Sequence, residues 1–294
     1  MKYDVLVLGE LLADLISTEY VGRLKEATTF SMHPGGSPAN VCANLNWLGL
    51  QTAMVSCVGN DSIGDLLVDS FSKMKLEVSY ISRSETLPTS MVLVGKSKGT
   101  PDFIAYRMAD TQIPPVKEEL IQRSALLHTS AFALSREPAR SVIIDAFHRA
   151  HQSGKQISAD WNYAPGIWQD DGVEVFERLC SFRPLLKLSL DDVERFVARP
   201  LSPEDAMIFL DRFEASVMCL TCGKDGVWYK AQGNTWSFKP ATPVAEVKDV
   251  TGAGDAFWSG FLCAHLHQQS LDVCVENALS MAAKKIQRVG PLYC

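Results

Sequence analysis

The sequence has no cluster of basic residues and no long apolar segment. Acidic residues outnumber basic ones, 34 against 28, giving a net charge of -6. Binding to nucleic acids or anionic membranes relies on clustered Lys and Arg, so we expect neither partner. No run reaches the length of a membrane span. The apolar run Val5 to Leu8 is short and flanked by acids, unlike a secretory signal, so we expect a cytoplasmic protein whose eight cysteines are free thiols.

Two common nucleotide-binding loops and a zinc site are also missing. A dinucleotide fingerprint G-x-G-x-x-G starting at Gly252 would need glycine where Phe257 stands. A Walker loop ending at Lys96 would need glycine where Ser90 stands. The single C-x-x-C, starting at Cys219, has no second pair and lies in an apolar run typical of a buried strand. A dinucleotide-dependent redox enzyme therefore lacks its motif.

The composition is that of a globular protein, with 47% hydrophobic and 21% charged residues among 294. From about residue 120, short apolar runs alternate with helical patterns. This alternation predicts a central, mostly parallel β-sheet with helices on both faces. We expect strands at 125–128, 157–159, 185–188 and 217–220, with helices such as 138–153 and 205–213 between them, after earlier strands at 3–8 and 52–58.

The most informative stretch is Asp249-Val250-Thr251-Gly252-Ala253-Gly254-Asp255, which precedes an almost charge-free run from 256 to 271. Its small residues let successive backbone N–H groups point into one concavity, and the apolar run predicts a buried helix whose N-terminus favours phosphate. Asp255 lies in the first turn, where a carboxylate can accept the proton of an attacking hydroxyl. The alternative is a glycine-rich turn with an acidic residue capping a core helix.

This stretch resembles the D-T-x-G-A-G-D signature of the ribokinase-like (PfkB-type) carbohydrate kinases, with Val250-Thr251 in place of Thr-x. Gly35-Gly36-Ser37-Pro38-Ala39-Asn40 resembles the family's N-terminal G-G-x-x-x-N signature. The two lie in the family's order, and family-like features run through nearly the whole chain. The resemblance implies one ribokinase-like α/β domain over residues 1–294. In it Asp255 is the base and the N–H groups of Gly252, Ala253 and Gly254 hold the transferring phosphoryl group.

The double glycine, together with Ser37, also has a reading from the residues alone. Ser37 followed by proline is typical of a helix N-cap followed by the first helical position, and Val41 and Leu45 continue a helical pattern that Gly49 ends. A plain turn would not need two glycines, which permit close approach of a ligand. By resemblance, Gly35, Gly36 and Asn40 contact the sugar.

A small second sheet is expected near the N-terminus. Strands at 91–94 and 103–106 flank Lys98-Gly99-Thr100-Pro101, which is typical of a hairpin turn. With the segment around 15–33 they would form a sheet apart from the main one. The resemblance identifies this sheet, from segments 12–35 and 88–108, as a lid over the sugar, which would exclude water from phosphoryl transfer. Homodimers through the lid occur in similar proteins.

Further sugar contacts come from the resemblance. Asp14 follows the first strand, where open α/β sheets bind ligands, and by resemblance it holds sugar hydroxyls. Arg107 and Asp160 are likewise assigned to the sugar pocket by resemblance. The alternatives are an exposed loop acid at 14 and a solvated surface charge at 107. Asp160-Trp161-Asn162-Tyr163 is similar to the D-x-N-x-R of fructokinases, but Ala164 stands where arginine is expected.

ATP and Mg²⁺ are the cofactors that the resemblance implies, with K⁺ as a further expectation. The stretch from Lys187 to Asp192 aligns with the family's N-x-x-E phosphate and metal element, with Ser189 in place of Asn and Asp192 in place of Glu. It makes Lys187 and Ser189 candidate ATP contacts and Asp192 a candidate metal ligand, with Asp249 as a second one. A helix N-terminus capped by Ser189 is compatible with the same residues. The T-x-G-x-x-G turn and the start of a last helix would bind the nucleotide: Thr221, Gly223, Gly226 and Asn277.

The function that the resemblance implies is transfer of the γ-phosphoryl group of ATP to a sugar hydroxyl, with fructose as the first candidate substrate. Tyr106-Arg107 and the stretch after Asp160 resemble fructokinases most. The missing arginine at 164 leaves 2-keto-3-deoxygluconate, ribose, another sugar or a nucleoside open. A protein that binds sugar or nucleotide but has lost catalysis is the alternative of another class. Its support is Ala164, Ser189 and Asp192; the intact Asp255 and its glycines oppose it.

Overall fold

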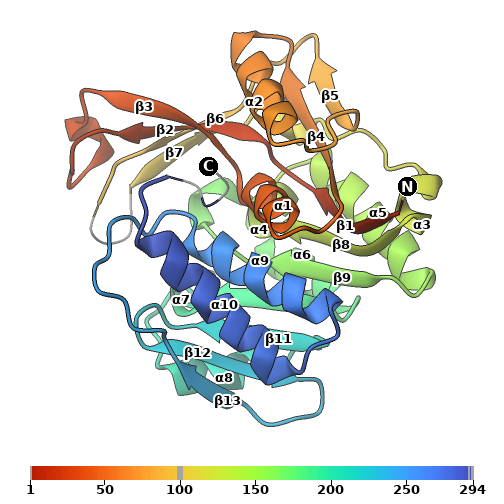
Figure 1. The fold of residues 1–294 in the computed structure, drawn as a ribbon, viewed down its shortest axis with the longest axis vertical. Helices are drawn as coiled ribbons and strands as arrows, with labels where there is room; N and C mark the ends of the chain where they lie inside the picture. The colour runs from red at the N-terminus through yellow and green to blue at the C-terminus, as the bar shows by residue number, and fades with distance from the viewer. Residues whose placement is uncertain (1, 98–101, 291, 293–294) are drawn as a thin grey trace.

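The computed structural model describes residues 2–97, 102–290 and 292, and it contains two sheets of unequal size (Figure 1). The larger has nine strands in the order β13-β12-β11-β10-β9-β8-β1-β4-β5. From β11 to β5 all neighbours are parallel, while β12 and β13 are antiparallel. The strands are β1 (Tyr3–Leu8), β4 (Thr52–Gly59), β5 (Ile81–Ser84), β8 (Ser124–Ser130), β9 (Gln156–Asp160), β10 (Leu185–Ser189), β11 (Val217–Thr221), β12 (Gly226–Ala231) and β13 (Ser237–Pro240).

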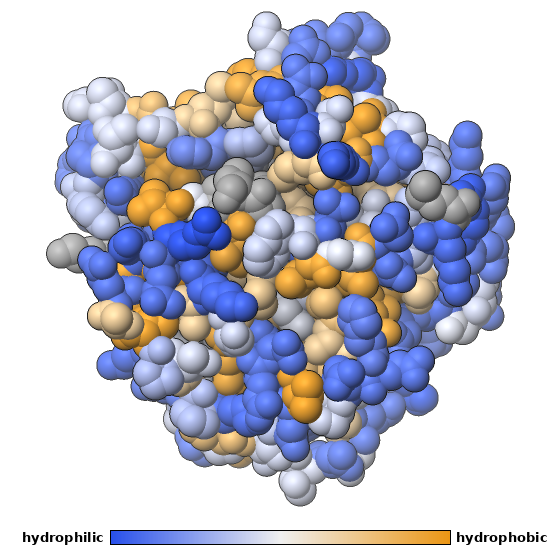
Figure 2. Space-filling view, viewed as in Figure 1, coloured by the Kyte–Doolittle hydropathy of each residue, from blue (hydrophilic) through white to orange (hydrophobic). Residues whose placement is uncertain are grey.

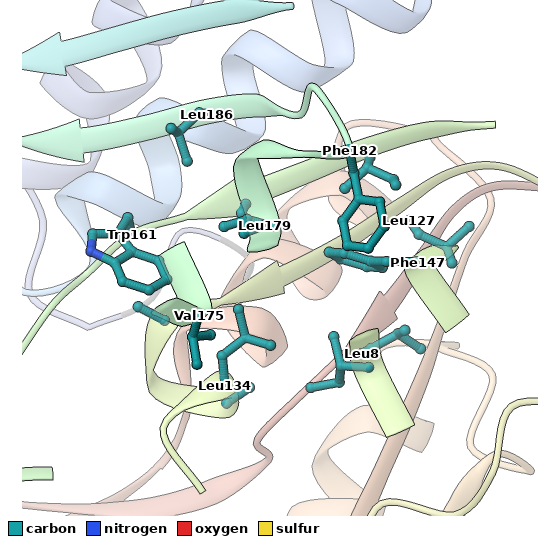
Figure 3. Close-up of a cluster of buried hydrophobic side chains, with 14 of the residues drawn as sticks. Leu8, Leu127, Leu134, Phe147, Trp161, Val175, Leu179, Phe182 and Leu186 are labelled. Atoms are coloured by element: carbon teal, nitrogen blue, oxygen red, sulfur yellow. The ribbon is translucent and has the colours of Figure 1, made fainter. Parts of the chain in front are cut away.

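Both faces of the large sheet are covered, which explains why its central strands are apolar throughout. In β1, Val5 and Val7 pack into one apolar cluster and Leu6 and Leu8 into another. Figure 3 shows the second cluster, in which Leu8 and side chains from β8 and β10 meet Phe147 and Leu179 of the covering helices. The predicted α/β architecture with helices on both faces is confirmed.

The helices divide between these two faces. Helices α1, α9 and α10 contribute to the cluster around Val5, and Gly260 of α9 lets α10 approach closely, because a Cβ there would lie 2.8 Å from the carbonyl oxygen of Asn277. The helices are α1 (Ser37–Trp47), α2 (Ser62–Lys73), α3 (Glu118–Gln122), α4 (Ala131–Leu134), α5 (Ala139–Gln152), α6 (Gly172–Cys180), α7 (Leu190–Val197), α8 (Pro203–Leu210), α9 (Ala253–Leu266), α10 (Leu271–Ile286) and the short 3-10 turns Leu24–Glu26, Ala109–Thr111 and Pro165–Ile167.

The smaller sheet has the order β3-β2-β6-β7 and comes from the two predicted segments. Its strands are β2 (Leu12–Ser17), β3 (Phe30–Gly35), β6 (Met91–Val94) and β7 (Phe103–Tyr106). Figure 1 shows it extending from one side of the main body. The separate sheet is thus confirmed, whereas the turn predicted at 98–101 lies outside the described residues.

Two predicted helix starts are wrong, and a serine cap explains each of them. The helix predicted at 205–213 begins at Pro203 and ends at Leu210, because Ser202 accepts a hydrogen bond from the N–H of Asp205. Asn277 does not begin the last helix, which starts at Leu271 behind the cap of Ser270. The charge-free helix begins at Ala253, inside the glycine loop. No helix in the described ranges is long and apolar enough to cross a membrane.

Candidate active site

The carboxyl ends of four neighbouring strands bring several predicted residues to one edge of the main sheet. In the register of the sheet, Asp160 of β9 lies between Ser130 of β8 and Lys187 of β10. Ser189 pairs in the same way with Thr221 of β11. This is the edge at which open α/β sheets bind their ligands.

Asp255 lies in the first turn of α9 and is buried, with 9% of its surface exposed. Its Oδ1 accepts a hydrogen bond of 2.7 Å from the hydroxyl of Ser37, and its Oδ2 accepts one of 2.9 Å from the side-chain amide of Asn40. Burial raises the pKa of the Asp255 carboxyl, and these two donors together with Lys187 and Lys285 oppose that rise. The carboxylate is thus held in a fixed orientation by two donors from α1.

Ser37 was predicted to cap helix α1, and this is wrong. The N-cap is Gly36, with a φ of 104° that favours glycine, and no side chain caps the helix. The Ser37 hydroxyl is directed to Asp255 instead, while its backbone N–H donates to Oε1 of Glu10 at 3.1 Å. The double-glycine turn therefore brings a hydroxyl to the carboxylate.

Glu10 was missed by the sequence analysis, since it stands alone after the first strand. It is 2% exposed and also accepts a hydrogen bond of 3.0 Å from the hydroxyl of Ser130. Burial raises the pKa of Glu10 to about 8, in spite of the opposing charge of Arg107. Its contacts hold the double-glycine turn against the end of β8.

The glycine loop has part of the predicted anion-binding form. Gly252 adopts the left-handed conformation with a φ of 74°, directly before α9. The N–H of Ala253 donates to the carbonyl oxygen of Val250 at 3.1 Å, so the three-donor cradle that included Ala253 is not formed here. Within the described chain, the N–H groups of Gly252 and Gly254 have no acceptor. Two donors at the helix N-terminus thus remain for an anionic oxygen.

Lys187 lies beside this loop. Its ammonium contacts both carboxylate oxygens of Asp160 at 3.0 Å, and it lies 2.8 Å from the position that a Cβ on Gly254 would occupy. Burial opposes its charge, but the neighbouring carboxylates Asp160 and Asp192 raise the pKa of Lys187, so the ammonium form prevails. Asp160, predicted to contact sugar, is instead seen paired with Lys187.

Asp14 of β2 lies directly over Gly35 of β3. A Cβ on Gly35 would lie 2.1 Å from Oδ2 of Asp14, so only glycine leaves room for the carboxylate. Burial and the negative charge of Asp255 raise the pKa of Asp14 to about 7. The sugar contact assigned to Asp14 stays a prediction.

Arg107 is not a solvated surface charge. Its side chain is 6% exposed, its Nε pairs with Asp110, and its Nη1 donates to the carbonyl oxygen of Phe132 and the hydroxyl of Ser135, both at 2.8 Å. Its Nη2 is buried and has no acceptor among the described residues. One donor of this guanidinium thus remains for a ligand oxygen.

Some of the residues predicted to bind ATP or Mg²⁺ are already engaged in contacts within the fold, whereas others lie in open space. Asp192 accepts hydrogen bonds from the N–H and hydroxyl of Ser189 in a capping box and pairs with Arg195 at 2.6 Å. Gly226 is required by packing, since a Cβ would lie 2.2 Å from the carbonyl oxygen of Lys239, whereas Gly223 has open space around it. Thr221 ends β11 beside this turn.

Asn277 lies in the middle of α10, where its side-chain amide donates to the carbonyl oxygen of Val273. It lines a groove of about 380 Å³ between α9 and α10, with Gly260 and His267 of α9. The nucleotide contact assigned to Asn277 stays a prediction.

The match to a known family decides between the two interpretations of the loop 249–255, a phosphate-binding loop of a kinase or a glycine-rich turn that only caps a core helix. Residues 2–294 match the profile described as pfkB family carbohydrate kinase. The chain belongs to that family. It is an ATP-dependent carbohydrate kinase, as its relatives' names and folds agree.

Three curated relatives of this pfkB-family kinase differ in substrate. An ATP-dependent 6-phosphofructokinase from Thermoanaerobacterium thermosaccharolyticum is 37% identical, over 99% of this chain and 90% of the relative. A fructokinase from Salmonella typhimurium is 31% identical over 90% and 85%. A 2-dehydro-3-deoxygluconokinase from Bacillus subtilis is 28% identical over 99% and 92%. Family membership thus leaves the acceptor sugar open.

Solved structures confirm the ribokinase-like fold. A fructokinase from Halothermothrix orenii superimposes with a TM-score of 0.84 at 35% identity, covering 95% of this chain and 98% of the other. A sugar kinase from Pyrococcus horikoshii in complex with ATP has a TM-score of 0.84 at 26% identity, covering 98% and 94%. A putative ribokinase from E. coli with ATP and Mg²⁺ shares the fold, with a TM-score of 0.85 at 20% identity over 99% and 94%.

Asp249 and Lys285 form a second ion pair at the glycine loop of the pfkB-family kinase. Nζ of Lys285 lies 3.1 Å from Oδ2 of Asp249, and Oδ1 of Asp249 accepts a hydrogen bond from the N–H of Thr251. Burial raises the pKa of Asp249, but the Thr251 N–H and the Lys285 charge outweigh it and lower that pKa. Lys285 was missed because a lysine in a C-terminal helical turn is usually a solvated charge.

Proposed function

We propose that this kinase transfers the γ-phosphoryl group of ATP to a hydroxyl of a neutral sugar, fructose being the first candidate. The observation that carries the proposal is the buried Asp255 at the N-terminus of α9, held by Ser37 and Asn40 beside two free N–H groups. A carboxylate and an anion site within one helical turn are what an attacking hydroxyl and a transferring phosphoryl group need.

Each group then has a defined part in the reaction. Asp255 accepts the proton of the sugar hydroxyl as its oxygen attacks phosphorus, and its orientation is fixed by the two donors from α1. The N–H groups of Gly252 and Gly254 and the ammonium of Lys187 face the negative charge that develops on the transferring group. Asp160 orients Lys187 rather than the sugar in this arrangement.

ATP would lie across the ends of β10 and β11, near Thr221 and the open turn at Gly223. That the chain binds ATP is in keeping with the ATP complex of the Pyrococcus relative. Mg²⁺ would neutralise the ATP phosphates. The oxygens of Asp192 already accept bonds from Ser189 and Arg195, so this carboxylate suits contact with Mg²⁺ through water rather than direct ligation. Asp249 is likewise engaged by Lys285.

The charges around the site favour a neutral acceptor. In the described chain the buried basic side chains there each have a carboxylate partner: Arg107 with Asp110, Lys187 with Asp160 and Lys285 with Asp249. A phosphorylated or acidic sugar would need a further positive charge, whereas hydroxyls need only donors and acceptors such as Asp14 and Nη2 of Arg107. Fructose fits this balance better than 2-keto-3-deoxygluconate.

Fructose 6-phosphate is the second candidate, because the 37% identical relative is a 6-phosphofructokinase. If the enzyme required the 6-phosphate of this sugar, that phosphate would have to bind basic residues without a carboxylate partner among the described residues. His33, exposed and paired in register with Asp14, is the basic side chain next to the predicted sugar contact.

The smaller sheet would act as the lid and as a dimer interface. Met32, Leu15, Leu93 and Ile104 form one cross-strand row on it, and Met32 and Ile104 are 43% and 48% exposed. Figure 2 shows apolar side chains at the surface over this sheet. An exposed apolar sheet face of this kind suits a second copy of the chain, which a change from dimer to monomer in an Ile104→Glu variant would demonstrate by light scattering.

The proposal is tested by ADP release with ATP and Mg²⁺ from the wild type and from Asp255→Asn. The acceptors are fructose, fructose 6-phosphate, 2-keto-3-deoxygluconate, ribose and adenosine. We expect fructose to give the highest kcat/KM, and kcat to fall about 10²- to 10⁴-fold in the variant, the usual contribution of a general base. Asp69→Asn, an exposed acid on α2, is the matched control. Turnover that survives in Asp255→Asn would refute the assigned base.

A further inference from the structure

Lys285 is a buried lysine that the proposed reaction leaves without a part. It is 4% exposed in the last turn of α10, although its neighbour Lys284 is exposed. Its ammonium contacts the carboxylate of Asp249 at 3.1 Å and the backbone carbonyl oxygen of the same residue at 3.4 Å. A buried ammonium is costly unless it is paired, so these contacts define where the charge is held.

The same contacts fix the start of the glycine loop. The N–H groups of Lys248 and Asp249 both donate to the carbonyl oxygen of Ile286, at 2.7 and 3.2 Å. Asp249 also accepts from the N–H of Gly290 at 3.4 Å. The end of α10 and the beginning of the loop are therefore one hydrogen-bonded unit with the Lys285 ammonium at its centre.

This unit adjoins the anion site. Cε of Lys285 lies 3.8 Å from the position that a Cβ on Gly252 would occupy. Gly252 holds the left-handed conformation on which the direction of the loop's N–H groups depends. Lys285 thus adjoins the loop at Gly252, whereas Lys187 adjoins it at Gly254.

The expected K⁺ does not fit the oxygens found here. A monovalent cation beside the loop would take carbonyl and carboxylate oxygens. The backbone carbonyl oxygen and Oδ2 of Asp249 contact the Lys285 ammonium, and Oδ1 of Asp249 accepts from the N–H of Thr251. We propose that Lys285 is a positioning residue whose ammonium holds the glycine loop as a cation from solution otherwise would, so that activity does not depend on added K⁺. This rests on the loop being the phosphoryl-binding element of the proposed function.

The experiment compares the wild type with Lys285→Ala in buffers of equal ionic strength. The sole monovalent cation is K⁺, NH₄⁺, Na⁺ or tetramethylammonium, which is too large for the site. We expect the wild type to have the same kcat in all four. The variant should lose about 10²-fold in kcat with tetramethylammonium, since a displacement of about 1 Å in a reacting group can cost that much. K⁺ or NH₄⁺ should restore part of the loss, which a purely structural role would not allow. Lys284→Ala is the matched control and should behave as the wild type.

Thermal unfolding without substrate gives a second readout that is independent of the assigned reaction. We expect K⁺ and NH₄⁺ to raise the Tm of Lys285→Ala above its value with tetramethylammonium, and to leave the Tm of the wild type unchanged. If no acceptor is phosphorylated, the proposed function fails while this measurement still tests Lys285. A wild type activated by K⁺ would overturn the inference even if the variant does not fold. So would a variant whose kcat and Tm respond to none of the cations.

Discussion

Nζ of Lys187 lies 2.8 Å from the point that a Cβ on Gly254 would occupy, so the ammonium rests against the first turn of α9 where any side chain would displace it. The Lys187 side chain is flexible, but its ion pair with Asp160 holds the end in place. Glycine at 254 therefore leaves room for the Lys187 ammonium, while its helical backbone does not require glycine.

Gly254→Ala should lower kcat about 10²-fold with little loss of stability. The added methyl group displaces the Lys187 ammonium from the anion site, and a misplacement of about 1 Å can cost that factor. Gly254 is not among the glycines with positive φ, so alanine suits its helical backbone. Gly166→Ala, with open space around it, is the control. Steady-state kinetics and thermal unfolding measure the two effects, and an unchanged kcat would remove Lys187 from the mechanism.

Residues of this site that belong to short motifs or to strand ends could be predicted from the sequence. Contacts between side chains far apart in the chain could not. The loop 249–255 and the strand ends carry their chemistry in short motifs, since parallel strands must meet at one edge. Ser37 has the pattern of an N-cap, but its hydroxyl serves a carboxylate 218 residues further on. Local propensity cannot register such a partner.

Charged residues that stand alone in the sequence, outside any motif, were also missed. Glu10 and Lys285 stand in no motif, and each is buried only because elements far along the chain close over it. Asp160 was assigned by resemblance, but its pairing with Lys187 depends on the register between β9 and β10, which the sequence does not specify. The position of a group was thus easier to predict than its partner.

Ser37→Ala should shift the acidic limb of kcat against pH upward. The Ser37 hydroxyl donates to the charged form of Asp255, so losing it disfavours the carboxylate and raises the pKa of the base further. Activity should then be lost at a higher pH on acidification. Ser31→Ala, an exposed serine on β3, is the control. A profile that does not move, or moves downward, would show that this hydrogen bond does not tune the base.

Gly35→Ala should raise KM for the sugar and leave KM for ATP close to that of the wild type. The new methyl group would lie 2.1 Å from Oδ2 of Asp14, so the carboxylate has to leave its place on β2. Gly95→Ala, directly after β6 of the same small sheet and near Val21, is the comparison. Equal changes in both KM values would mean that the substitution disturbs the fold rather than the sugar contact.

In Glu10→Gln, stability should decrease less with rising pH than in the wild type. The carboxyl of Glu10 has a pKa of about 8 in the folded protein against 4.5 as its ordinary value, because burial favours the neutral form. Its stabilising contribution is therefore fully present below the unfolded pKa and is lost as pH rises through about 8. Glutamine stays neutral and can still accept the Ser37 N–H, so it lacks this loss.

Tm measured from pH 5 to 9 should fall less steeply in Glu10→Gln than in the wild type, while Glu246→Gln, at an exposed acid, should follow the wild type. Parallel curves for Glu10→Gln and the wild type would mean that Glu10 is charged in the folded protein, and the positive charge of Arg107 rather than burial would then set its protonation.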